Sequence, residues 1–290
     1  MHATIFANKR SKDIKRVDFK YISQVLAGHY EHVEIMILQN FDDITPLKTL
    51  VERSNLIVVI GGDGTVSFIV NAIMKYSPSA RLMILPTGTM NDFAYSLGMD
   101  KQHMRDLMWL KDSREKSVDV IRINDTYATY LIGLGPFMTM FTTPDAQDKR
   151  RYGKLSYLKA GIIGLGRLKS FEYILDGKRN RAKIIVISNI SSVGGFRRLF
   201  PLLRVDDGML NILTIRHINV WRAIVMIFML FNNRLHQLKD VEIKSTQSLT
   251  LSSDALKYMD VDGDKQPFET LHIELEPQKL NVVVPKLKKV

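Results

Sequence analysis

The sequence contains no cysteine, no long apolar run and no histidine pair at the spacing of metal ligands. The lack of cysteine excludes disulfide bonds, cysteine-bound zinc and a thiol nucleophile. The most apolar stretch, Val220–Phe231, is shorter than the roughly 18 residues that a membrane-spanning helix needs, and it contains Arg222. The first residues, MHATIFANKRSK, lack the apolar core of a secretory signal, so we expect a cytoplasmic protein.

The composition is that of a globular protein with a large excess of positive charge. The 290 residues are 46% hydrophobic and 24% charged, and the net charge is +11. This length favours two domains over a single core. The positive charge favours anionic partners such as nucleic acid, phosphorylated ligands or an acidic membrane surface. The basic residues are scattered and no recognition motif accompanies them, so we expect no nucleic-acid binding; a solvated basic face is the alternative.

Residues 1 to 118 alternate strand-like and helix-like patterns. Apolar runs predict strands at His2–Ala7, Val33–Leu38, Leu56–Ile60 and Leu82–Leu85, and amphipathic stretches predict helices such as Phe19–Leu26 and Val66–Met74. This alternation is typical of a parallel sheet that is covered by helices on both faces.

After Ser117 short strands and turn signals dominate. Strands are predicted at Asp119–Asn124, Tyr127–Gly133, Phe171–Leu175, Lys183–Ser188, Leu210–Ile215, Val241–Leu251 and Leu271–Leu275, and helices at Lys154–Leu168 and Val220–Leu230. Turn signals stand at Asn124-Asp125, Asp176-Gly177 and Asp262-Gly263. The pattern predicts a second, mostly β domain.

The stretch IGGDGTV, Ile60–Val66, follows a buried strand directly and opens a helix. Glycines at the carboxyl end of a parallel strand let backbone amides approach a phosphate. The loop is neither a dinucleotide loop, because Ser67 takes the third glycine position, nor a P-loop, because no Gly-Lys-Ser/Thr follows. Asp63 fits a phosphate loop if Mg²⁺ lies between the acid and the phosphate. The alternative is that Asp63 only caps the helix.

A second motif, LPTGTMNDFAYSLG at Leu85–Gly98, has the same arrangement of strand, turn and helix. Asn91 and Asp92 fall at the start of its helix. Two neighbouring strand ends therefore each present Gly-Thr and one acid, and we expect Asp63 and Asp92 to share one cluster of metal and water.

The combination of GGDGT at 61–65 with PTGTMNDFA at 86–94 resembles the diacylglycerol kinase catalytic family, which includes bacterial soluble diacylglycerol kinases and sphingosine kinases. NAD kinases share only the first of these motifs. Weaker matches extend the resemblance over nearly the whole chain, at YGKLSYL (152–158), LLRVDDGMLNI (202–212) and VDGD (261–264).

The resemblance implies an α/β nucleotide-binding domain related to phosphofructokinases and NAD kinases, residues 1–118, and a β-sandwich lipid-substrate domain, residues 119–275, with the active site between them. The tail, residues 276–290, would return to the first domain, with Asn281–Val284 as a closing strand.

The resemblance also implies phosphorylation of a lipid hydroxyl by ATP with Mg²⁺, with diacylglycerol converted to phosphatidic acid. The protein would act peripherally at an acidic inner membrane face. Three alternatives are left open. The substrate could be a sphingoid lipid or NAD, the protein could be a weak or inactive family member that binds nucleotide or lipid, and it could form a homodimer.

Site residues follow by the same resemblance. The nucleotide phosphates would be held by Asn8, Gly61, Gly62, Asp63, Gly64, Thr65, Val66, Ser67, Gly88, Thr89 and Asn91. Asp63, Asp92 and Asp119 would surround the catalytic Mg²⁺, with a turn acid as the alternative for Asp119. A second, structural Mg²⁺ would be held by the Asp207 carboxylate and the carbonyls of Arg204 and Met209; a plain hairpin turn is the alternative.

Two departures from the family pattern bear on activity. The family's Asn-Pro-x-Ser/Ala-Gly turn is replaced by ANKRSKD, in which Lys9 and Lys12 could hold phosphate as point charges. The catalytic base, a glutamate in the family, is Asp264 here. The side chain of aspartate is shorter than that of glutamate by one methylene group. Either the loop moves inward, or Asp262 acts as the base instead, or the enzyme is slow.

The residues that would contact the lipid substrate are less well defined. Val220–Phe231 and Gly161–Leu168 would line an acyl-chain groove or lie against a bilayer, and the alternative is that they pack on the sandwich.

Overall fold

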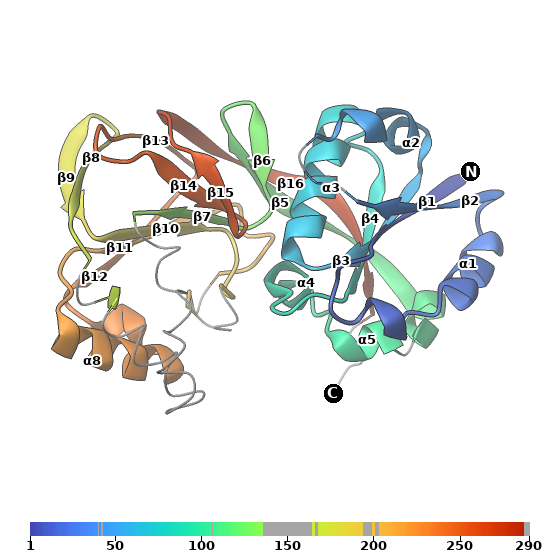
Figure 1. Cartoon of the computed structure of the whole chain (residues 1–290), viewed down its shortest axis with the longest axis horizontal. Coiled ribbons are helices and arrows are strands. Elements are labelled where there is room, and N and C mark those ends of the chain that lie inside the picture. Colours follow the sequence, from blue (N-terminus) through green and yellow to red (C-terminus); the bar gives the residue numbers. More distant parts are fainter. Residues whose placement is uncertain are drawn as a thin grey trace.

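The computed structural model describes residues 1–39, 41, 43–105, 107–135, 164–165, 168–193, 199–200 and 203–286. The motif at 152–158 and most of the predicted helix Lys154–Leu168 lie outside the described residues. The described part forms two halves side by side, one with helices around a sheet and one made mainly of strands (Figure 1).

The first half is a parallel sheet in the order β2-β1-β3-β4. Its strands are β1 (His2–Asn8), β2 (His32–Leu38), β3 (Leu56–Gly61) and β4 (Arg81–Pro86). Its helices are α1 (Phe19–Ala27), α2 (Lys48–Arg53), α3 (Asp63–Tyr76), α4 (Asp92–Ser96) and α5 (Lys101–Arg105).

The central strand β3 shows why this region folds as a covered sheet. All six of its residues, LIVVIG, are buried, which is typical of a parallel strand with both faces covered. Ile57 and Val59 pack in the cluster that contains α2 and α3, whereas Val58 packs with Ile22 of α1 on the opposite face. Helices therefore cover both faces, as the alternating sequence pattern predicts.

The strand β16 (Leu271–Pro285) joins the two halves into one continuous sheet (Figure 1). It pairs antiparallel with β13 (Ser248–Ser252), while further along Val282 and Val283 pair in parallel with Leu82 and Met83 of β4. β5 (Ser113–Ile123) accompanies it along most of its length. The expected return of Asn281–Val284 to the first sheet is therefore the last part of β16.

The second half is a sandwich of antiparallel strands. One layer extends the first sheet through β16, β13, β8 (Phe171–Leu175) and β9 (Lys178–Ala182), and β5 also pairs with β6 (Thr126–Ala128). The other layer has the order β12 (Val241–Thr246), β11 (Leu210–Ile215), β10 (Ile184–Ser188), β7 (Leu131–Leu134), β14 (Tyr258–Val261) and β15 (Asp264–Pro267). Leucine and isoleucine side chains from both layers share one core. The fold class, an α/β domain with a β-sandwich domain, is confirmed.

Two of the predicted strands are each divided into two in the structure, and two others, Asp119–Asn124 and Leu271–Leu275, correspond to parts of the longer β5 and β16. Tyr127–Gly133 is divided into β6 and β7, because the amides of residues 129–131 bond to the carboxylate of Asp262 instead of continuing one ladder. Val241–Leu251 is divided at Gln247 into β12 and β13, which belong to different sheets. The pattern also missed β9, β14 and β15, which are rich in charged or polar residues.

Each of the three predicted turns is formed with a residue in the left-handed region. The φ values are 49° at Asn124, 48° at Asp176 and 53° at Asp262. Asparagine and aspartate tolerate this conformation, and each turn here joins a pair of antiparallel neighbours.

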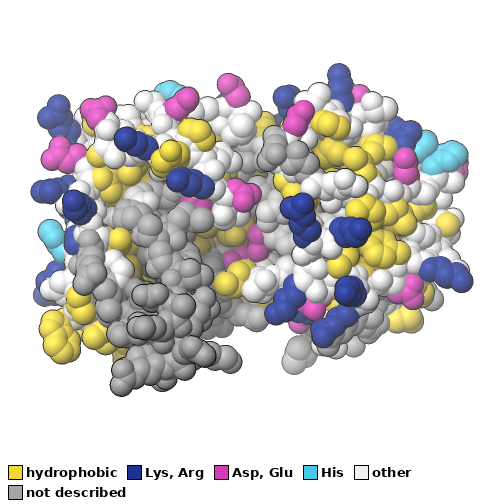
Figure 2. Space-filling view, in the orientation of Figure 1, with side chains coloured by type: hydrophobic (Ala, Val, Ile, Leu, Met, Phe, Trp, Pro, Cys, Tyr) yellow, Lys and Arg dark blue, Asp and Glu magenta, His cyan; other side chains and the backbone are white. Residues whose placement is uncertain are grey.

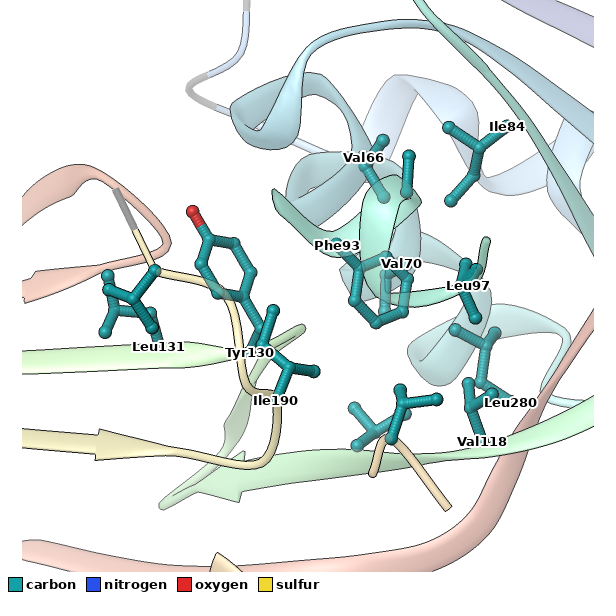
Figure 3. Close-up of a cluster of buried hydrophobic side chains, with 14 of the residues drawn as sticks. Val66, Val70, Ile84, Phe93, Leu97, Val118, Tyr130, Leu131, Ile190 and Leu280 are labelled. Atoms are coloured by element: carbon teal, nitrogen blue, oxygen red, sulfur yellow. The ribbon is translucent and has the colours of Figure 1, made fainter. Parts of the chain in front are cut away.

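The apolar core is continuous across the junction of the two halves (Figure 3). Phe93 of α4 lies beside Val70 and Leu97, and Tyr130 and Ile190 approach the same region from the sandwich. Since Phe93 and Ile190 are fully buried, the halves are packed together rather than merely tethered.

Polar contacts at this junction converge on Asp262, which is buried between β14 and β15. Its carboxylate accepts bonds from the Ser67 hydroxyl of α3 at 2.7 Å and from the Thr129 amide and hydroxyl at 2.7 and 2.8 Å. The amides of Tyr130 and Leu131 each donate at 3.0 Å. Burial raises the pKa of Asp262, and these donors oppose the rise. One carboxylate therefore fixes α3 against the sandwich.

We predict that Asp262→Asn lowers the free energy of unfolding by on the order of 3 kcal/mol, because the amide nitrogen cannot accept the bonds of the oxygen that it replaces. Urea unfolding at neutral pH measures the change. The exposed Asp254→Asn is the control and should stay within about 0.5 kcal/mol of wild type. Equal stability of the Asp262 variant and wild type would contradict the assignment.

Candidate active site

The loops after β3 and β4 meet backbone to backbone. A Cβ built on Gly88 would lie 2.5 Å from Gly62 Cα and 2.7 Å from Asn91 Oδ1. Asn91, at φ 57°, bonds through its side chain to both the amide and the carbonyl of Gly88, at 3.0 and 3.1 Å. Glycine is thus required at positions 62 and 88 because the two backbones lie too close for a Cβ atom. The side chain of Asn91 holds the loop at Gly88 in its conformation.

Asp63 and Asp92 lie together at the starts of α3 and α4, as the two motifs predict. Asp63 Oδ1 accepts the amide of Phe93 at 3.2 Å, and Asp92 Oδ1 accepts the hydroxyl of Ser192 at 2.7 Å. Burial and the nearby charge of Asp92 raise the pKa of Asp63 to about 6, against the opposing effect of the amides at 91–93.

The alternative role for Asp63, as the cap of its own helix, is wrong. Gly62 is the N-cap residue of α3, and no side chain caps this turn. The Asp63 carboxylate instead bonds to the first turn of the neighbouring helix α4. The first-turn amides of α3 therefore have no side-chain acceptor at their cap, and Gly62, Gly64 and Thr65 line a cleft.

This cleft has a volume of about 670 Å³ and lies at the junction of the two halves. The α/β half contributes Asn8, Arg10, Ser11, Lys12, Phe41, Asp43, Ile44, Gly62, Gly64, Thr65, Ser67, Phe68, Asn71, Gly88 and Thr89. The sandwich half contributes Thr126, Tyr127, Val261, Asp264 and Gln266. Glycine-rich helix starts, cationic side chains and two carboxylates, Asp43 and Asp264, thus line a common space.

Two of the residues that were expected to hold phosphate, Val66 and Ser67, make other contacts. Val66 is buried in the core and its amide donates to Gly62 O at 3.0 Å. The hydroxyl of Ser67 donates to Asp262. Gly61 is also buried, where a Cβ would meet Thr65. Their packing holds the loop in shape and leaves Gly62, Gly64 and Thr65 on the cleft wall.

The loop after β1 lacks the proline and glycine of the family turn, and side-chain hydrogen bonds hold it instead. Asn8 accepts the amide of Arg10 at 2.9 Å and donates to Thr65 Oγ1 at 3.0 Å. Ser11 and Thr87 share a hydroxyl contact of 2.7 Å. Arg10 and Lys12 line the cleft, whereas Lys9 is not among its lining residues in the described part of the chain. Sequence reasoning missed Arg10, whose only signal was its position after the first strand.

Comparison with known proteins matches this architecture to two family models. Residues 2–123 match the diacylglycerol kinase catalytic domain, and residues 142–284 match the YegS C-terminal NAD kinase beta sandwich-like domain. The chain belongs to the diacylglycerol kinase catalytic family.

Relatives of similar length agree with this assignment. Proteins of Staphylococcus haemolyticus (strain JCSC1435) and Staphylococcus carnosus (strain TM300), both named "Putative lipid kinase", are each 26% identical. The alignments cover 97% and 83% of this chain, and 96% and 80% of the relatives. The crystal structure of a diacylglycerol kinase from Bacillus anthracis str. Sterne is 20% identical, with a TM-score of 0.72 over 98% of this chain and 96% of that one, and it shares the fold.

Membership of a kinase family implies use of ATP. No helix in the described part of the chain is long and apolar enough to cross a bilayer.

Asp264 occupies the place that the diacylglycerol kinase resemblance gives to the base. It is exposed in the cleft, and a Cβ built on Gly64 would lie 3.6 Å from its Oδ2. Partial burial raises the pKa of its carboxyl group. The suggestion that Asp262 acts instead is wrong, because that carboxylate is buried and bound by donors on both oxygens.

Asp119 lies with the turn at 204–209. Its carboxylate accepts the amides of Gly208 and Gln278, each at 2.8 Å. Burial raises the pKa of Asp119, and the charges of Asp207 and Asp206 add to the rise. The acids that act on Asp119 are thus those of the turn, whereas Asp63 is influenced by Asp92. A role of Asp119 at the catalytic Mg²⁺ stays a prediction.

The turn itself is closed by Asp207, whose carboxylate accepts the amides of Arg204 and Met209 at 2.9 and 3.0 Å. These are the residues whose carbonyls were expected to bind a second Mg²⁺. The turn is formed as sequence predicts, and the metal stays a prediction.

The residues at the cleft fit a hydrated Mg²⁺. Within the described ranges, no group of three or more histidine or acidic side chains is placed to hold a metal. Mg²⁺ commonly keeps several waters and needs only one or two carboxylates with substrate phosphates. Asp63 and Asp92, at the starts of α3 and α4 beside the cleft-lining glycines, offer that pair, and a cation would oppose the effect of burial and of the Asp92 charge, which raise the pKa of Asp63.

We predict that Asp63→Asn stabilises the protein at neutral pH when Mg²⁺ and nucleotide are absent. An acid whose pKa is higher in the folded state than in the unfolded state stabilises the fold most at pH values below its ordinary pKa of 3.8. This stabilisation is lost as the pH rises through the folded-state pKa of about 6. The variant should therefore exceed wild type in free energy of unfolding at about pH 7.5 and match it near pH 4.

Urea unfolding across this pH range checks the prediction, and Asp254→Asn is the surface control. Asp260, whose pKa is also raised to about 6, remains in both proteins, so the difference isolates Asp63. A variant that is less stable than wild type at neutral pH would refute the account.

Proposed function

We propose that the chain transfers the γ-phosphate of ATP to the hydroxyl group of a lipid, with diacylglycerol as the acceptor and Mg²⁺ as the cofactor. The observation that carries the proposal is the junction cleft, in which a helix start without a side-chain cap adjoins the half-buried Asp63 and the buried Asp92 and lies close to Asp264. The names of the related kinases support a lipid acceptor and, for the Bacillus anthracis structure, diacylglycerol.

The nucleotide phosphates are bound in this scheme by backbone and charge rather than by a P-loop. The amides of Gly62 and Gly64 and the hydroxyl of Thr89 lie on the cleft wall, and the helix start adds positive potential. Arg10 and Lys12 supply the charges that the family's proline-glycine turn does not carry. Mg²⁺, when bound at Asp63 and Asp92, would neutralise charge on the transferred phosphoryl group.

Asp264 accepts the proton of the lipid hydroxyl. It lines the same cleft as Gly62 and Gly88, and its Oδ2 lies close to Gly64 in the first turn of α3. Because burial raises its pKa, the carboxylate is a better proton acceptor than an ordinary aspartate. Thus a shorter side chain than glutamate serves here as the base.

We predict that Asp264→Asn lowers kcat by on the order of 100-fold or more, whereas Asp264→Glu stays within about tenfold of wild type, because only the latter keeps a base. Asp63→Asn should abolish transfer, and Asp254→Asn should leave it unchanged. Radiolabelled ATP with diacylglycerol in mixed micelles measures the rates.

NAD and a sphingoid base are tested in parallel as acceptors. Labelling of NAD alone would replace the lipid assignment, and full activity of Asp63→Asn would remove the proposed metal site. Tight nucleotide binding without transfer to any acceptor would indicate a binding protein.

A further inference from the structure

The helix α8 (Val220–Phe231) exposes large apolar side chains on the sandwich half. Trp221, Phe228 and Phe231 are 79%, 66% and 68% exposed. Of its residues only Ala223 and Met226 are buried, so packing on the sandwich accounts for a narrow stripe of the helix. Figure 1 places α8 at the lower end of this half, where Figure 2 shows apolar side chains gathered on the surface. Exposed apolar patches of this kind commonly mark sites of contact with a protein or a membrane.

The second expected lipid element differs from α8. In Gly161–Leu168, Leu165 and Leu168 are buried in the core, and residues 161–163 and 166–167 lie outside the described part. Among the described residues of these two elements, the exposed large apolar side chains belong to α8.

The segment around α8 carries positive charge only. Between Asp207 and Asp240 the sequence has no aspartate or glutamate, but it contains Arg216, Arg222, Arg234 and Lys239. Arg222 pairs with Asp240 at 2.7 Å, which anchors the first turn of the helix to the start of the following strand. Arg216 likewise pairs with Glu242 at 2.5 Å, so these two arginines are partly neutralised. The apolar face is thus flanked by basic side chains from a segment without acids, which is typical of helices that lie in the interface of an anionic bilayer.

A cationic pocket adjoins the start of α8. It has a volume of about 430 Å³ and is lined by Ser170, Arg179, Asn180, Arg181, Lys183, Arg216 and His217. The Lys183 ammonium donates to the carbonyl of Ile218 at 2.7 Å, two residues before the helix, and this contact joins pocket and helix. Among the described residues, the pocket lining has no acid, and of its cations Arg216 is paired with Glu242 beside the pocket, whereas Arg179 and Arg181 form no ion pair within the described part of the chain. Guanidinium groups in this arrangement suit a phosphate headgroup.

We propose that α8 and this pocket, together the α8 surface, dock the protein on a bilayer that contains anionic phospholipids. Trp221, Phe228 and Phe231 enter the interface between headgroups and acyl chains, while Arg179 and Arg181 contact phosphates. A second copy fits less well, because a two-fold contact through this surface would bring like charges together. The inference rests on the proposed function only in that docking brings a lipid kinase to its substrate.

Vesicle binding of the full-length protein tests the α8 surface. The sequence has two tryptophans, so Trp221 is the single reporter in a Trp109→Phe background. We expect its fluorescence to shift to the blue with vesicles of phosphatidylglycerol and phosphatidylcholine but not with phosphatidylcholine alone. The double variant Phe228→Ser/Phe231→Ser should sediment with these vesicles on the order of 10- to 100-fold more weakly.

Charge and matched controls are measured in the same assay. Arg179→Gln/Arg181→Gln should weaken binding by on the order of tenfold and reduce its dependence on salt. The control Ile35→Ser/Ile37→Ser removes two side chains that are each 43% exposed on β2, and it should bind as wild type does. Lys20→Gln/Lys75→Gln is the charge control.

Three results would overturn the proposal. They are an absence of vesicle binding by wild type, unchanged binding of the Phe228 and Phe231 variant, and a dimer in sedimentation equilibrium that this variant converts to a monomer. An assay with a water-soluble short-chain diacylglycerol as the acceptor distinguishes failure of the kinase assignment from failure of the docking proposal. Transfer to it without vesicle binding rejects docking alone, and vesicle binding without transfer rejects the kinase alone.

Discussion

The carboxylate of Asp262 sets the geometry on which the cleft depends. It receives the hydroxyl of Ser67 from α3 and backbone amides from the segment before β7, so two halves of different architecture are held in one position. The same contacts fix the turn between β14 and β15. Asp264, two residues further along, is thereby held over Gly64. Burying a carboxylate is costly, and the density of donors around it is what makes the arrangement stable.

The carboxylates of Asp63, beside the cleft, and Asp264, in its lining, have fewer donors among the described residues than Asp262. Burial and the neighbouring Asp92 raise the pKa of Asp63, and partial burial raises that of Asp264. Asp262 and Asp63 are therefore opposite cases within one junction. One carboxylate is saturated by donors and serves structure, whereas the other is short of positive charge and suits a cation. Sites that bind ions commonly trade stability for function in this way.

The continuous sheet through β16 relates this cleft to the surface that we assign to the bilayer. The cleft lies where the two halves meet, and the cationic pocket lies where β9 and β11 end, beside α8. Basic side chains stand at both places: Arg10 and Lys12 line the cleft, whereas Arg179 and Arg181 are exposed on β9 and line the pocket.

The sequence by itself determined the features that depend on local pattern. Apolar runs marked the parallel strands, the motifs around Asp63 and Asp92 marked two adjoining strand ends, and three turn signals marked hairpins. Only the tertiary structure decided that Asp262 is a buried anchor while Asp264 faces the cleft, and that Asp119 lies beside Asp207. It also placed β12 and β13 in different sheets. These outcomes depend on burial and on contacts between residues far apart in the chain, which neither side-chain periodicity nor turn composition encodes locally.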